Sequence, residues 1–189
     1  MKERYRDEVI RALNEVDLTQ VKRVSDCLQQ SYRDDRLVCL IGNGGSAANA
    51  SHFAEDLCKS VLNDDTKKRF RVLSLTDNTA FITAVANDIG YDNIFTFQLR
   101  QFARSGDMLI AISGSGNSPN VIKAVEYAKA NNIFTIGFTG FDGGKLHKLV
   151  DLNVHVPVMN MGQAEVVHLI LFHMIIDMLK ARLTAADCT

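Results

Sequence analysis

Hydrophobic positions along this chain alternate between helical spacing and short continuous runs. Residues 3–33 carry apolar side chains three or four positions apart, which predicts one long helix or two helices separated near Asp17-Leu18-Thr19. The next segment, 36–42, is almost continuously apolar and stops at a glycine. Such a run is typical of a strand that is covered on both faces of a parallel sheet.

The same alternation continues toward the C-terminus. Further strands are predicted at 71–75, 107–113, 133–138 and 151–156. Helices are predicted between them, at 46–62, 79–86, 92–103, 120–130 and 145–150. Strands that alternate with helices predict an α/β fold, a doubly wound, mostly parallel five-stranded sheet flanked by helices, with N-terminal helices and a long C-terminal helix.

We interpret residues 1–189 as a single domain, because neither a repeat nor a linker divides the chain. A chain of this length buries roughly 70% of its unfolded surface, which is enough for one core. The domain is expected to consist of a helical segment at 3–33, an α/β core at 36–156 and a C-terminal helix at 162–184. In such sheets ligands bind beyond the carboxyl ends of the strands, near the point where the strand order reverses.

Composition and charge narrow the partners and the compartment. Lys+Arg 21 against Asp+Glu 22 gives a formal charge of −1, so neither nucleic acid nor a membrane surface is an expected partner. No apolar stretch approaches the ~20 residues of a membrane span, and the charged N-terminus is unlike a signal peptide. Four cysteines without CxxC spacing indicate a reducing compartment, and we expect the cytoplasm.

Two loops rich in glycine and serine carry the candidate chemistry. The segments 42–46 (GNGGS) and 113–118 (SGSGNS) each join a predicted strand to a predicted helix. Glycines let the backbone approach a ligand closely, and a helix N-terminus offers free N–H groups to an anion. The alternative is that these loops are only tight connections, with Ser118 as a helix cap, but two of them at one end of a sheet favour a phosphate site. Neither matches a P-loop or the dinucleotide-binding pattern.

Four segments together identify a family resemblance: GNGGSAA at 42–48, SHFAEDL at 51–57, AVANDIGYDNIF at 84–95 and SGSGNSPNVIKA at 113–124. The combination resembles the SIS (sugar isomerase) domain family, and within it the phosphoheptose isomerases, which convert sedoheptulose 7-phosphate to a mannoheptose 7-phosphate. The resemblance implies a SIS domain fold, a phosphorylated sugar as the ligand and an isomerase activity.

The resemblance also implies which residues bind the substrate. The turn after the first core strand supplies Asn43, Gly44, Gly45 and Ser46. The phosphate cradle consists of Ser113, Gly114, Ser115 and Ser118. The sugar chain is expected to contact Asn87, Asp88 and Glu165.

For the reaction itself, the resemblance implies Asp56 and His173 as catalytic residues and a metal site of His52, Asp56, Glu165 and His173. Two histidines and two carboxylates suit Zn²⁺, which is the expected cofactor, one ion per subunit. Glu165 and His173 are eight residues apart, about 12 Å along a straight helix, so both reach one ion only if their side chains converge. Apart from the resemblance, histidines on an apolar helix more often serve packing.

Three positions depart from the family pattern. Asp56 stands where the family has glutamate, Glu165 where it has glutamine, and Gly114 where it commonly has threonine. Exchanging an aldose and a ketose needs a base near carbon, an acid near oxygen and stabilisation of an enediolate. Asp56 lies four residues after His52 and shares its helix face. Its carboxylate is set back by roughly 1.5 Å relative to that of glutamate.

Three functions are consistent with these residues. The first is an isomerase of sugar phosphates, most directly of sedoheptulose 7-phosphate, through an enediol or enediolate. The second is a non-catalytic SIS module that binds a sugar phosphate or a nucleotide-sugar as a regulator or protein-binding factor. The third is an isomerase of another sugar, retuned by Asp56 and Glu165. Because Asp56 and His173 are both ionisable, an enzyme is favoured.

Self-association is also expected. The last predicted helix is apolar nearly all round between residues 166 and 176, and such a helix is normally buried. A monomer of this size would leave part of that surface in water. Symmetric pairing of helices removes it, and the family resemblance implies a homotetramer with active sites at subunit interfaces.

Overall fold

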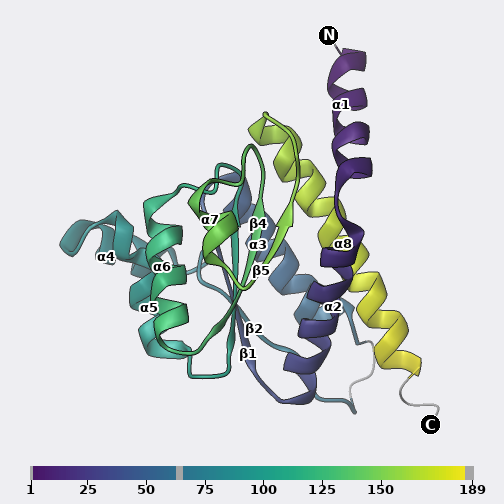
Figure 1. Cartoon of the computed structure of the whole chain (residues 1–189). Helices are drawn as coiled ribbons and strands as arrows, with labels where there is room; N and C mark the ends of the chain where they lie inside the picture. Colours follow the sequence, from purple (N-terminus) through teal and green to yellow (C-terminus); the bar gives the residue numbers. More distant parts are fainter. Residues whose placement is uncertain (1, 63–65, 186–189) are drawn as a thin grey trace.

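A five-stranded parallel sheet forms the centre of the computed structural model, which describes residues 2–62 and 66–185. In chain order the strands are β1 (Leu37–Gly42), β2 (Arg71–Ser74), β3 (Met108–Ser113), β4 (Phe134–Thr139) and β5 (Leu152–His155). Their order in the sheet is β2-β1-β3-β4-β5, and every neighbouring pair is parallel. The predicted fold class is confirmed (Figure 1).

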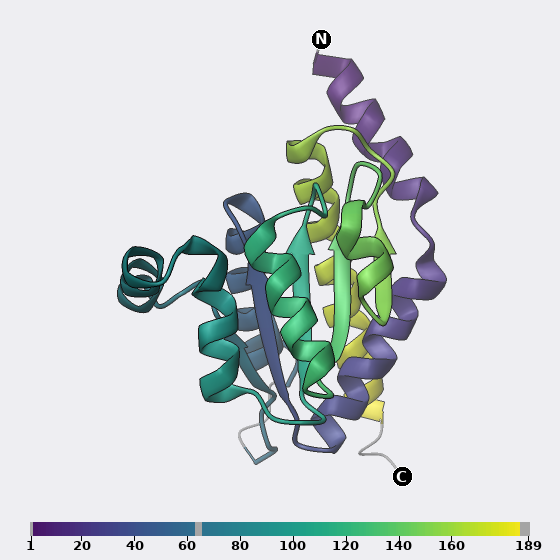
Figure 2. The same cartoon turned by 60° about the vertical axis from the view of Figure 1, so that its left-hand side comes forward.

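Two layers of helices cover the sheet (Figures 1 and 2). One layer holds α2 (Leu18–Arg33), α3 (Gly45–Glu55) and α8 (Met161–Ala185), with α1 (Lys2–Glu15) alongside α8. The other holds α5 (Ile94–Phe102), α6 (Pro119–Ala130) and α7 (Gly144–Leu149). Alternate residues of each strand enter the two cores. Val38 and Leu40 of β1 face the first layer, and Cys39 and Ile41 face the second.

The N-terminal segment consists of two helices. Its pattern was compatible with one long helix or with two, and the structure has two. They separate at Asp17, whose side chain accepts a hydrogen bond of 2.9 Å from the Thr19 amide and so caps α2. The first half of α1 extends past the end of the sheet (Figure 1). Among the described residues, no helix combines the length and the apolar character that crossing a membrane requires.

Local structure differs from the prediction at three helix ends. The helix predicted at 46–62 is α-helical only to Glu55 and continues as a π-helical turn, η1 (Asp56–Ser60). The helix predicted at 92–103 is preceded by a 3₁₀ turn, η2 (Tyr91–Asn93). Ser118 occupies the N-cap position of α6, as predicted, but its hydroxyl makes no capping hydrogen bond and lies 3.5 Å from the Ser113 Oγ instead.

The cysteines make no disulfide in the described chain. Cys27 and Cys58 are half-buried and Cys39 is buried, and burial raises the pKa of the Cys39 thiol to about 12. These thiols are therefore uncharged and weakly reactive. Cys188 lies outside the described residues.

A buried histidine ties α8 to the end of β4. His168 is fully buried, and its Nε2 donates to the Thr139 carbonyl at 3.2 Å. Its ring packs near those of Phe138 and Phe172. Because burial disfavours the imidazolium, the pKa of His168 falls to about 4.

This shift makes stability depend on pH. Between about pH 6.5 and pH 4 the unfolded chain binds a proton at His168 that the folded chain does not. The free energy of unfolding should therefore fall as the pH drops through this window, by roughly 3 kcal/mol from this group. Urea unfolding at a series of pH values should show a shallower decline for His168→Gln than for the unchanged chain. His147→Gln, which alters an exposed histidine, is the control, and parallel pH profiles for all three proteins would contradict the assignment.

Candidate active site

A cavity of about 280 Å³ opens where the strand order reverses, at the carboxyl ends of β1 and β3. Both glycine- and serine-rich loops contribute to it, as the sequence predicted. The lining residues are Asn43, Gly44, Gly45, Ser46, Ile112, Ser113, Gly114, Ser115, Ser118, Met161 and Glu165. The structure thus brings together every predicted substrate-binding residue except Asn87 and Asp88.

The first loop is held by side-chain hydrogen bonds. Asn43 exchanges two hydrogen bonds of 2.9 Å with Asn120, and its Oδ1 also accepts one of 3.0 Å from the Tyr91 hydroxyl. Gly44 has a φ of +57°, which favours glycine, and α3 begins at the next residue. Asn43 therefore shapes the rim of the cavity. The sequence did not identify Tyr91 and Asn120 as neighbours of Asn43, because they lie 48 and 77 positions farther along the chain and no pattern links such distant positions.

The second loop places hydroxyl groups beside two helix N-termini. Ser113 is buried and its Oγ accepts a hydrogen bond of 3.2 Å from the Gly116 amide. The Ser115 Oγ accepts one of 3.3 Å from the Asn117 amide. None of the residues that line the cavity is lysine or arginine. An anion here would be held by hydroxyls and by the positive ends of α3 and α6.

Two side chains of α8 close one wall of the cavity, each against a glycine. A Cβ on Gly114 would overlap the Sδ of Met161, and a Cβ on Gly45 would overlap the carboxylate of Glu165. Met161 and Glu165 are four residues apart and so share a helix face. Met161 was not predicted from sequence. Its sulphur fills the space where a threonine at position 114 would place its side chain.

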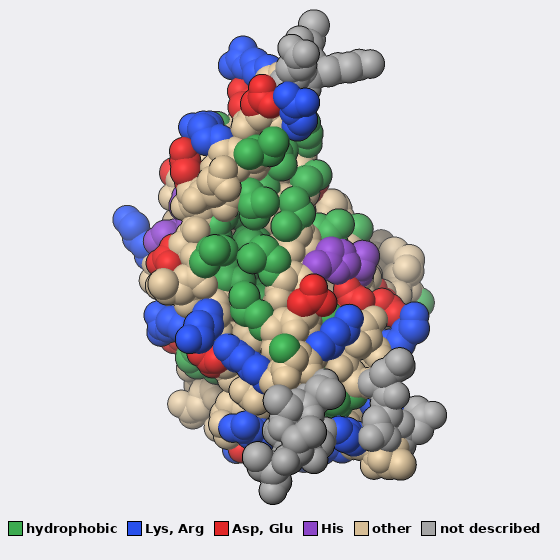
Figure 3. Space-filling view, turned by 90° about the vertical axis from the view of Figure 1, so that its right-hand side faces the viewer, with side chains coloured by type: hydrophobic (Ala, Val, Ile, Leu, Met, Phe, Trp, Pro, Cys, Tyr) green, Lys and Arg blue, Asp and Glu red, His purple; other side chains and the backbone are tan. Residues whose placement is uncertain are grey.

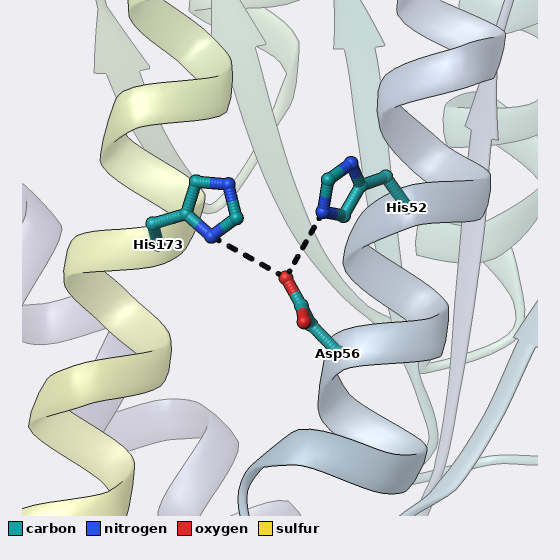
Figure 4. Close-up of side chains that lie close together, drawn as sticks. All are labelled: His52, Asp56 and His173. Atoms are coloured by element: carbon teal, nitrogen blue, oxygen red, sulfur yellow. Dashed lines mark ion pairs between the residues drawn. The ribbon is translucent and has the colours of Figure 1, made fainter.

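A second cluster lies farther along α3 and α8 (Figure 4). The Asp56 Oδ2 is 3.3 Å from the His52 Nε2 and 3.5 Å from the His173 Nδ1. Asp56 keeps only 12% of its side-chain area exposed, whereas the two histidines are about half exposed. Its Oδ2 is buried and makes no hydrogen bond to any described residue. A buried carboxylate oxygen in this state calls for a positive partner.

This cluster fits a metal ion. Its three ligand atoms all lie within 4.8 Å of one another. Zinc bonds of about 2 Å in tetrahedral geometry place ligand atoms about 3.3 Å apart, close to the two separations from the Asp56 Oδ2. Two histidines and one carboxylate leave a fourth position open, as in catalytic zinc sites. Glu165, the fourth ligand expected from sequence, lies in the cavity and outside this group.

The cavity and the cluster are connected by α3 and α8, which run side by side in the same direction. The Asn49 side chain donates a hydrogen bond of 2.9 Å to the Glu165 carbonyl, and farther along the rings of Phe53 and Phe172 stack at 4.4 Å. His173 is eight residues beyond Glu165, about 12 Å along the helix axis. Both helices therefore begin at the cavity. His52 and His173 follow about two turns after Gly45 and Glu165, and Asp56 lies about one turn beyond His52, at the start of η1.

Asn87 and Asp88 lie apart from both features. They end α4 (Thr79–Asp88), which projects from the side of the molecule (Figure 2). Both side chains are exposed, and the Asn87 Nδ2 donates to the Asp88 Oδ1 at 2.8 Å. Within one copy of the chain they do not line the cavity.

Fold and site together define an α/β domain with a serine- and glycine-lined cavity at the carboxyl ends of its strands, and comparison with known proteins gives the family. The chain belongs to the SIS domain family, with the match spanning residues 4–140. It is 38% identical over 167 residues to the phosphoheptose isomerase of Sulfurimonas denitrificans, covering 88% of this chain and 85% of the relative. It is 34% identical over 179 residues to a probable phosphoheptose isomerase of Thermoplasma acidophilum, covering 95% and 97%. The structure of the phosphoheptose isomerase from Neisseria gonorrhoeae superposes with a TM-score of 0.85 at 32% identity, over 93% of this chain and 94% of that one. The resemblance predicted from the motifs is confirmed.

The cavity geometry predicts the effect of adding a charge. Ser115→Asp would place a carboxylate in a cavity that has no cationic side chain. Calorimetry with sedoheptulose 7-phosphate should show binding lost, while the melting temperature stays within a few degrees because the residue lies in a surface loop. Ser115→Asn introduces a side chain of the same size as aspartate but without the charge, and it should weaken binding much less. Equal affinity for Ser115→Asp and the unchanged chain would show that the phosphate binds elsewhere.

Proposed function

We propose that the protein is an isomerase of sugar phosphates that acts on sedoheptulose 7-phosphate. The observation that carries the proposal is the His52–Asp56–His173 cluster, which lies on the same two helices that begin at the serine-lined cavity. Binding of a phosphorylated ligand alone does not require a buried carboxylate oxygen between two imidazoles at a distance from the anion site. The similarity to phosphoheptose isomerases supports the same activity.

The spacing of the two features supports a long sugar. Ser46 lines the cavity and His52 belongs to the cluster; His52 lies six positions after Ser46 on α3, a rise of about 9 Å along the helix axis. Carbon–carbon bonds of about 1.5 Å extend a zigzag chain by about 1.3 Å each, so carbon 2 of an extended heptose 7-phosphate lies about 9 Å from phosphorus. By this comparison a seven-carbon chain matches the spacing along α3 better than a three- or four-carbon sugar phosphate does.

In this proposal the serines and helix N-termini hold the phosphate and the cluster carries out the proton transfers. Asp56 accepts the proton from the carbon next to the carbonyl, the electron pair forms an enediolate, and Asp56 returns the proton to the neighbouring carbon. His173 moves a proton between the two substrate oxygens. A Zn²⁺ ion held by His52, Asp56 and His173 would act as a Lewis acid toward a substrate oxygen.

Hydrogen exchange in D₂O tests this assignment. Incubation with sedoheptulose 7-phosphate and Zn²⁺, followed by NMR, should show deuterium at the carbon next to the carbonyl. Asp56→Asn should lower the exchange rate by at least about 100-fold, because it removes the base while keeping the shape of the side chain. Binding measured by calorimetry should persist. Glu55→Gln, the adjacent carboxylate on the exposed side of α3, should exchange at the rate of the unchanged chain.

Other results would redirect the assignment. If the unchanged chain binds the sugar phosphate but shows no exchange with or without Zn²⁺, the protein is a binding module. Exchange on a different sugar phosphate and none on the heptose would keep the reaction class and overturn the substrate.

We further propose that the protein assembles as a homotetramer. Hydrophobic side chains form a stripe over the face made by α1 and α8 (Figure 3). Tyr5, Ile10 and Val166 are each more than 40% exposed, so a single chain leaves uncovered part of the helix that its sequence predicts to be buried. A second copy of the same stripe covers it by two-fold symmetry, and a further two-fold contact between two such dimers forms the tetramer. Neighbouring copies would also bring Asn87 and Asp88 of the projecting α4 to a sugar chain.

Light scattering tests the assembly. The mass in solution should be about four times 21.0 kDa at micromolar concentration. Val166→Glu, on the exposed stripe, should lower the mass, because it places a charge in the contact. Glu126→Lys, on the outer face of α6, should leave it unchanged. A monomer for the unchanged chain would contradict the proposal.

A further inference from the structure

Glu165 is the one charged side chain among the described residues that line the cavity. The other lining residues are small, hydroxyl-bearing, amide or apolar. A cavity suited to phosphate therefore contains a carboxylate and lacks a balancing cation. Phosphate monoesters carry about −1.5 to −2 charges at neutral pH, so the two anions repel one another.

The position of this carboxylate is set by its surroundings. The Glu165 carbonyl accepts the hydrogen bond from Asn49, and the absent side chain of Gly45 leaves room for the carboxylate at the start of α3. The turn of α8 that carries Glu165 is anchored on both sides. The backbone N–H of Gln163 donates a hydrogen bond of 3.2 Å to the Asn160 Oδ1. The side-chain Nε2 of Gln163 donates one of 2.7 Å to the carboxylate of Glu8 on α1. This hydrogen bond from Gln163 lowers the pKa of Glu8.

The chemistry of a carboxylate beside an anion site distinguishes two kinds of ligand. A bare dianion such as sulfate is repelled by Glu165, and no cationic side chain among the residues that line the cavity offsets this repulsion. A phosphate ester of a polyhydroxy chain carries hydroxyl groups next to the phosphate. These groups can donate to the carboxylate, and hydrogen bonds to a charged acceptor are about twice as strong as neutral ones.

We infer that Glu165 is a specificity-determining residue, which admits phosphate esters of polyhydroxy chains and weakens the binding of bare phosphate or sulfate. The inference rests on the proposed sugar-phosphate site and deepens it. Inorganic phosphate is abundant in cells and would otherwise compete for the same serines and helix N-termini. With Glu165 in place, affinity depends on the sugar as well as on the phosphate.

Calorimetry with sulfate and with sedoheptulose 7-phosphate tests the inference on the full chain. Glu165→Gln should bind sulfate about tenfold more tightly, because it removes the like charge and keeps the size of the side chain. The sugar phosphate should gain less, since its hydroxyls lose a charged acceptor. The ratio of the two dissociation constants should therefore shift toward sulfate by about fivefold to tenfold. Glu126→Gln removes the same charge as Glu165→Gln, but from the exposed face of α6, and it should leave both affinities unchanged.

Thermal melts of the three proteins confirm that the variants fold. Equal sulfate affinity for Glu165→Gln and the unchanged chain, or an unchanged ratio between the two ligands, would overturn the inference. These outcomes are separable from failure of the proposed function. If the ratio shifts as expected but no deuterium exchange occurs, Glu165 still selects the ligand and the isomerase assignment fails. If exchange occurs and the ratio does not shift, the isomerase assignment holds and the role of Glu165 is wrong.

Discussion

The register of α3 against α8 is the constraint on which the site depends. The stacked rings of Phe53 and Phe172 fix it in the middle of the contact. Each buried aromatic side chain of this size contributes on the order of 1.5–3 kcal/mol, so slipping one helix past the other is costly. Because both helices start at the cavity, a slip of one turn would separate Gly45 from Glu165 and Asp56 from His173 together. Anion site and cluster are therefore positioned by one piece of hydrophobic packing.

The cavity and the His52–Asp56–His173 cluster stabilise negative charge in different ways. In the cavity, hydroxyls and helix ends supply partial charges that are fixed by the backbone, so little side-chain entropy is lost when an anion binds. In the cluster, Asp56 stands at the first residue of a π-helical turn, a local irregularity that is frequent at functional sites. There the positive partner of a buried oxygen has to come from imidazolium or from a bound cation.

Much of this arrangement can be predicted from sequence, for identifiable reasons. Strands covered on both faces appear as unbroken apolar runs, so the runs at 36–42 and 107–113 agree with β1 and β3 to within a residue. The loops that follow them were correctly expected to meet, since parallel strands end at one edge. Positions that depend on packing between distant segments were not predictable. The family resemblance implies Glu165 both as a contact of the sugar chain and as a metal ligand. The structure places its carboxylate in the cavity and outside the metal-binding group, because Gly45, 120 residues earlier, has no side chain to exclude it.

The contact between Gly114 and Met161 also limits how this cavity can change during evolution. Because the sulphur of Met161, near the flexible end of its side chain, occupies the space beside Gly114, a threonine at that position requires Met161 to change its rotamer or to be replaced by a smaller residue. Gly45 and Glu165 are coupled in the same way. The effect of a substitution in either loop therefore depends on which residue α8 already carries, and the order of changes matters. Epistasis between the loops and the first turn of α8 follows directly from the shape of the wall, and it restricts the paths by which this cavity could come to accept another sugar.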